Sequence, residues 1–104
     1  MAGPGLASDL VRQFLADLSA LELRLAEGFA RTDWHLLRTA SHGLIALAGT
    51  AGANGLHLAA ERLNHLAHSQ DEPALSEMRD GLLGLLGALI SFIASQMPQD
   101  SQTA

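Results

Sequence analysis

Four stretches of the sequence place apolar side chains every three or four residues, which is the period of an amphipathic α-helix. We expect helices over residues 9–31, 33–51, 54–68 and about 73–97. Ser8 is the predicted N-cap of the first helix, and Thr32 or Asp33 caps the second. Gly52 is placed to end the second helix, and Pro98 ends the fourth. The predicted inward stripe of the first helix consists of Leu10, Phe14, Leu18, Leu21, Leu25 and Phe29.

The pattern contains no strict alternation of apolar and polar residues, so no β-strand is predicted. Four amphipathic helices joined by short loops predict an all-α fold, an antiparallel up-and-down four-helix bundle. A chain of 104 residues corresponds to a single domain. Its core is expected over about residues 9–97, with flexible ends at 1–7 and 99–104.

Composition excludes several classes of function. The chain has no cysteine, which excludes a disulfide scaffold, an iron–sulfur cluster and a cysteine nucleophile. Its formal charge is −5, and all six basic residues are arginine, so no nucleic-acid partner is expected. The N-terminus does not resemble a signal peptide. The apolar run at 82–93 is shorter than a membrane span and predicts a buried core helix, so we expect a cytoplasmic protein without a membrane partner.

The second helix carries the most informative residue, His42. On a helical wheel His42 lies opposite the apolar side chains, so it is expected to project from the outer face. Its neighbours on that face include no acidic residue: His35, Arg38, Thr39, Ile45, Ala46, Gly49 and Thr50. An exposed imidazole is largely neutral near pH 7 and therefore nucleophilic. With no carboxylate one turn away to orient it, His42 is interpreted either as an acceptor that uses a partner's catalytic groups or as an ordinary surface histidine.

The segment 37–53 resembles the signature of histidine-containing phosphotransfer (HPt) domains. His42, Leu44, Ala48 and Gly52 stand at the matching positions, and the resemblance extends over about residues 9–97. It implies a helical bundle in which His42 accepts a phosphoryl group from a receiver-domain aspartate and passes it to another receiver. The implied partners are response-regulator receiver domains or a hybrid histidine kinase. The resemblance implies no cofactor in this chain, since the receiver supplies the Mg²⁺, and no autonomous catalytic machinery.

Two positions depart from that signature. The family's lysine three residues after the histidine is Ile45 here, and the glycine that follows it is Ala46. Arg38, one turn before His42, is the candidate substitute for the lysine beside the phosphoryl group. The predicted partner-docking residues are His35, Thr39, Ile45, Ala46, Gly49 and Thr50. The departures keep a second hypothesis open, an HPt-like module that binds a receiver or kinase without carrying phosphate.

Two further patterns have alternative interpretations. His57, Glu61, His65 and His68 share one face of the third helix and have the spacing of metal ligands, but the face is expected to be solvated, so we assign no metal. Gly81, Gly84 and Gly87 recur in the fourth helix, where they indicate tight packing within the bundle or a homodimer through this helix. A structural or oligomerising bundle with an incidental histidine is therefore the third hypothesis. The glycines within the second helix, Gly43 and Gly49, indicate close approach by a partner or a neighbouring helix.

Overall fold

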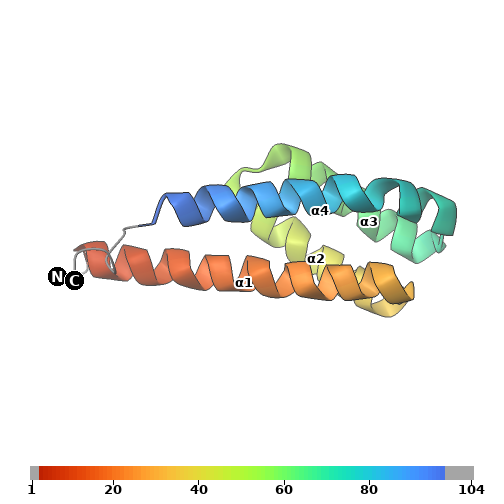
Figure 1. Ribbon diagram of the computed structural model, residues 1–104, viewed down its shortest axis with the longest axis horizontal. Coiled ribbons are helices and arrows are strands. Elements are labelled where there is room, and N and C mark those ends of the chain that lie inside the picture. Colours follow the sequence, from red (N-terminus) through yellow and green to blue (C-terminus); the bar gives the residue numbers. More distant parts are fainter. Residues whose placement is uncertain (1–2, 98–104) are drawn as a thin grey trace.

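The computed structural model describes residues 3–97, with side chains from Ser8 onward, as four helices. They are α1 (Gly3–Arg31), α2 (Trp34–Ala51), α3 (Asn54–Ser69) and α4 (Glu72–Ser95), arranged as shown in Figure 1. The predicted all-α four-helix bundle is confirmed. The helix at the N-terminus begins before the predicted Ser8 cap and includes residues 3–7. The expected flexible end at 99–104 lies outside the described residues.

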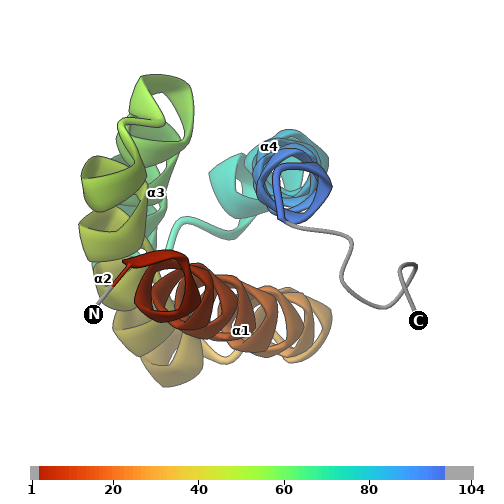
Figure 2. The same ribbon diagram turned by 90° about the vertical axis from the view of Figure 1, so that its left-hand side faces the viewer.

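The helices pack as a closed ring in which each touches its neighbours along the chain and α1 touches α4. Figure 2, a view along the bundle, shows α1 and α4 side by side with α2 and α3 across from them. Every helix contributes to this interior at least one leucine that has less than 2% of its surface exposed to solvent. These are Leu18 and Leu25 from α1, Leu37 and Leu44 from α2, Leu63 from α3, and Leu82 and Leu86 from α4.

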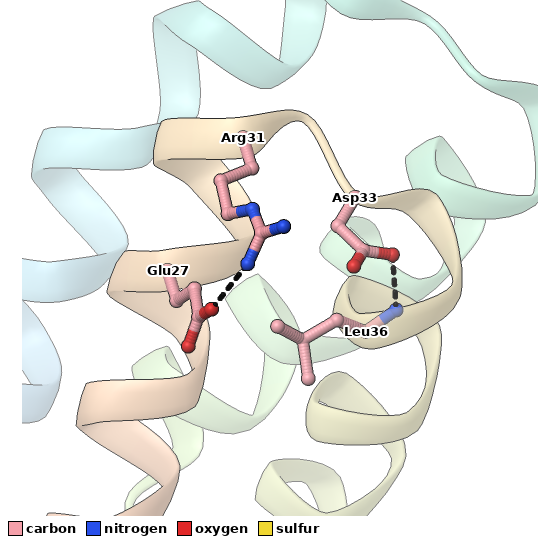
Figure 3. Close-up of polar contacts among 4 residues, drawn as sticks. All are labelled: Glu27, Arg31, Asp33 and Leu36. Carbon is pink, nitrogen blue, oxygen red and sulfur yellow. Dashed lines mark hydrogen bonds and ion pairs between the residues drawn. The ribbon is translucent and has the colours of Figure 1, made fainter.

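The turn between α1 and α2 is fixed by polar contacts that the sequence encodes locally (Figure 3). Asp33 is the N-cap of α2, and its Oδ1 accepts a hydrogen bond from the backbone N–H of Leu36 at 3.1 Å. Arg31, in the last turn of α1, pairs with Glu27 at 2.7 Å. Thr32 takes a left-handed conformation with φ of 48°, which lets the Asp33 N–H reach the Gly28 carbonyl. The predicted cap at Asp33 is therefore confirmed, and so is the left-handed Gly52 at the end of α2.

Gly28 lies where α1 approaches α2 closely, and two glycines of α2 lie at ordinary contact distance from side chains of other helices. A Cβ atom placed on Gly28 of α1 would lie 2.8 Å from Cδ2 of Leu37, well inside van der Waals contact. A Cβ on Gly43 of α2 would lie 3.4 Å from Leu21, and a Cβ on Gly49 would lie 3.9 Å from the His57 ring. The glycines inside α2 therefore face neighbouring helices of this chain.

The fourth helix is less buried than its composition suggested. Only 11% of its most apolar 18-residue window is buried, and Leu85 and Phe92 are exposed. On the other face Leu82 and Leu86 belong to the core, and Leu83, Leu89, Ile90 and Ile93 pack against it, so the segment 82–93 is a core helix on one face only. The complete helix, at 24 residues, is long and apolar enough to cross a membrane by length and composition. Gly81 and Gly84 face open space, and a Cβ on Gly87 would lie 3.6 Å from Oε2 of Glu22 on α1, an ordinary contact distance, so tight packing explains none of the three glycines.

One end of the bundle is open because its helices differ in length. Helix α1 has 29 residues and α2 has 18, so the N-terminal part of α1 and the C-terminal part of α4 continue past the turn between α2 and α3. Figure 1 shows these two ends, red and blue, projecting without the other two helices. Leu10 was expected in the core but is exposed, and Phe14 is half-buried, because α2 ends before it can cover them.

Candidate functional site

His42 lies on the solvent-exposed face of α2, on the side predicted by the helical wheel. Its neighbours in sequence, Ser41 and Leu44, point into the bundle and are fully buried. His35, Thr39, Ala46 and Gly49 are exposed on the same helix. The imidazole is therefore accessible to a partner protein without any rearrangement of the bundle.

A shallow groove runs along the seam between α2 and α3 and contains His42. Helix α2 lines it with His35, Arg38, Thr39 and His42, and α3 lines it with Asn64 and His68. Arg38 is half-buried here, and none of the carboxylates within residues 8–97 lines the groove, although the chain as a whole is acidic. A doubly charged anion beside His42 would thus meet one permanent cation and no permanent negative charge.

A buried hydrogen bond fixes α3 against α2 directly beside His42. The Ser41 hydroxyl, with no exposed surface, donates to the Arg38 carbonyl at 3.0 Å. The same oxygen accepts a hydrogen bond from Nδ2 of Asn64 on α3, also at 3.0 Å. The contact satisfies a buried polar group and also holds Asn64 in the groove. Sequence reasoning missed Asn64, because only the pairing of α2 with α3 brings it to His42.

The predicted docking residues differ in exposure and in the groove that they border. Ile45 is half-buried and packs against the core, so it presents little of its side chain to a partner. Thr50 is exposed, but it lies at the far end of α2 beside a different, apolar groove. The Thr39 and Thr50 hydroxyls donate to carbonyls of their own helix. His35, Thr39, Ala46 and Gly49 are the members of the predicted set that stay exposed on the helix face around His42.

The histidines of α3 are divided between two places. His57 is half-buried, its ring lies across Gly49 of α2, and its Nε2 is 3.9 Å from Oε2 of Glu61. His65 is exposed, and His68 turns toward the groove of His42. Within residues 3–97, no group of three or more histidine, aspartate or glutamate side chains is placed to hold a metal ion.

Comparison with known proteins finds no relative: no family model, curated protein or solved structure matches the chain. The resemblance of residues 37–53 to the HPt signature therefore stays a hypothesis. Its support is the motif itself together with the position of His42.

Proposed function

We propose that this chain is a phosphorelay intermediate of a two-component system, acting in the cytoplasm with His42 as the phosphoacceptor. The observation that carries the proposal is the exposed imidazole of His42 in a groove that the described part of the chain lines with Arg38 and without a carboxylate. An acceptor for a phosphoryl group needs an accessible nucleophile and a site without repelling negative charge. His42 supplies the accessible nucleophile, and the groove lining of residues 8–97 includes no carboxylate that would repel the phosphoryl group.

In the proposed reaction, the lone pair of one ring nitrogen of His42 attacks the phosphorus of a receiver's aspartyl phosphate. A phosphorus–nitrogen bond forms as the bond from phosphorus to the carboxylate oxygen breaks, and the aspartate leaves as a carboxylate. The proton on the other ring nitrogen stays with the imidazole, and its positive charge offsets part of the phosphoryl charge. Transfer onward to a second receiver is the reverse of this step. Phosphoryl transfer depends mainly on positioning and charge stabilisation, which the receiver's Mg²⁺ supplies in large part.

Arg38 is the group in this chain that is best placed to stabilise the phosphoryl oxygens. It lines the same groove as His42, one turn earlier on α2. Long side chains of a helix lean toward its N-terminus, which directs the Arg38 side chain away from His42. To contact a phosphoryl group on His42, the guanidinium must therefore take a rotamer that bends back, or the phosphoryl group must itself lie toward Arg38. Ile45 cannot take this role, since it is apolar and packs against the core. We propose His35, Thr39, Ala46 and Gly49 as the docking surface around this centre.

The direct test is phosphotransfer from a panel of phosphorylated receiver domains to the wild type, His42→Gln and His65→Gln. His65 is a matched control because it is an exposed histidine of α3 that does not line the groove. We expect transfer to the wild type and to His65→Gln but not to His42→Gln, with a label that is acid-labile and base-stable. A label that persists in His42→Gln would assign the acceptor elsewhere and contradict the proposal.

The role of Arg38 has its own test. Arg38→Ala should slow phosphoryl acceptance about 10- to 150-fold, because a charge-assisted hydrogen bond contributes about 1.5–3 kcal/mol. Arg38→Lys should restore part of the rate, and Arg62→Ala, which removes an exposed arginine of α3, should leave it unchanged. An unchanged rate and phosphohistidine lifetime in Arg38→Ala would remove Arg38 from the mechanism.

Ile45 favours a second candidate, an HPt-like module that binds a receiver or kinase without carrying phosphate. The family's lysine is missing at this position, and the isoleucine belongs to the packing against the core. This candidate predicts receiver binding that survives His42→Ala, with no label transfer to the wild type. A structural bundle with an incidental histidine predicts neither binding nor transfer.

A further inference from the structure

The open end of the bundle carries an apolar groove that is separate from the groove of His42. It is lined by Leu10, Val11 and Phe14 of α1 and by Leu89, Phe92 and Ile93 of α4, and the end of α2 closes one side. The two grooves share no residue. This open-end groove is the core-facing side of α1 and α4, continued past the point where α2 and α3 stop covering it.

The open-end groove has both protruding and recessed apolar parts. Leu10 and Phe92 protrude, with 64% and 62% of their surfaces exposed. Phe14, Leu89 and Ile93 are half-buried and form the floor. A face with both features can pair with itself about a two-fold axis, because each copy places its protruding side chains into the hollow of the other.

We infer that the open-end groove is an interface with a second copy of this chain. Two projecting helices are half of a four-helix arrangement, and the same two helices of a second copy supply the missing half. The bundle bodies then extend in opposite directions, and His42 of each copy stays accessible. A homodimer was among the alternatives for the glycines of α4, but the contact assigned here is Phe92 with Leu10, not the glycine positions.

Charge and composition favour a second copy of the chain over a lipid surface or residues 98–104 as the partner of the open-end groove. From Gly81 to Met97 the chain has no charged residue, and on α1 the Arg12–Asp9 pair closes at 2.9 Å, so two copies meet little repulsion. A lipid surface favours basic amphipathic helices, whereas this chain has no lysine and a charge of −5. Residues 98–104 include no large apolar side chain, so that segment has nothing to fill the groove.

The size of the face predicts a reversible dimer. Helix α1 exceeds α2 by 11 residues, or about 16 Å at about 1.5 Å per residue. Helix α4, with 24 residues, exceeds α3, with 16, by 8 residues, so its projecting part is shorter. Together the two projecting ends present on the order of a few hundred Å² of apolar surface, as recognition patches do. A standard interface buries about 800 Å² on each partner, so the dimer should dissociate on dilution.

Sedimentation velocity from about 1 μM to 1 mM tests the inference. The wild type should shift from monomer to dimer over this range. Phe92→Asp should raise the dissociation constant of the dimer about 1,000-fold, because a two-fold interface contains Phe92 twice and the substitution removes both copies. The matched control is Leu58→Asp, since Leu58 of α3 is 65% exposed but lies outside the groove. That variant should dimerise like the wild type.

Three results would overturn the inference. The wild type could stay monomeric up to about 1 mM, or Leu58→Asp could raise the dissociation constant as much as Phe92→Asp does. The third result is a monomer that binds lipid through Phe92. The last is measured by co-sedimentation with vesicles of neutral and anionic phospholipid. Leu10→Asp gives an independent disruption from α1, and circular dichroism verifies that each variant is folded. Phosphoryl acceptance by Phe92→Asp should equal that of the wild type, so a failed dimer and a failed phosphotransfer hypothesis give different results.

Discussion

The hydrogen bond between Ser41 and Asn64 gives a quantitative test of how the candidate site is built. Ser41 is fully buried, and its hydroxyl accepts the amide of Asn64 while it donates to the Arg38 carbonyl. Ser41→Ala removes one interhelical hydrogen bond, worth about 0.5–1.5 kcal/mol. The higher helix propensity of alanine returns about 0.5 kcal/mol. We therefore expect Ser41→Ala to lower the free energy of unfolding by about 0–1 kcal/mol.

Asn64→Ala acts on the other partner of the same bond. It leaves the buried Ser41 hydroxyl with its bond to Arg38 but without the amide donor, so a loss of about 1 kcal/mol is expected. Because both variants remove one shared interaction, the double variant should lose about 1 kcal/mol less than the two single losses combined. The assay is urea denaturation of all four proteins, followed by circular dichroism and by the fluorescence of Trp34, which is half-buried against the core.

The control for this comparison of single and double variants is a pair of residues that do not touch. Ser76→Ala removes an exposed serine of α4, and its effect should add to that of Asn64→Ala within about 0.3–0.5 kcal/mol. If the Ser41 and Asn64 variants were additive within the same limit, the hydrogen bond would not couple α2 to α3. In that case the hydrogen bond would not hold Asn64 beside His42.

Three further predictions concern the backbone that supports the site. Gly28→Ala should destabilise the protein by about 1–2 kcal/mol, because the added methyl group would clash with the buried Leu37. Gly84→Ala should instead stabilise it by about 0.5–1 kcal/mol, because Gly84 faces open space. Thermal unfolding of the two variants decides this, and a lower melting temperature for both would refute the packing argument. Gly52→Ala should cost about 1–2 kcal/mol because the φ of 72° is left-handed, and equal denaturation midpoints for variant and wild type would contradict this. Asp33→Ala should cost about 1 kcal/mol through loss of the α2 cap, with Asp33→Asn retaining most of the stability.

Local sequence determines most of the secondary structure of this protein. The periodicity of leucine and alanine predicts the four helices, and Asp33 and Gly52 mark the two ends of α2 for reasons confined to a few neighbouring residues. The outward position of His42 follows from the same period, because it lies opposite Leu37, Leu44 and Ala48 on one helix. The N-terminal boundary of α1 was predicted too late, because Ser8 has the chemistry of a cap without being used as one.

Only the tertiary structure decides what surrounds each helix, because helical periodicity says which residues share a face but not what that face meets. Arg38 and His42 share a groove with Asn64 and His68 only through the packing of α3 on α2, and the same packing half-buries Ile45. The exposure of Leu10 and Phe92 follows from the different lengths of α1 and α2, which leave apolar side chains beyond the end of their partner helix. The sequence by itself determined the helices and the outward direction of His42; the contacts between helices decided the groove around it and the open end.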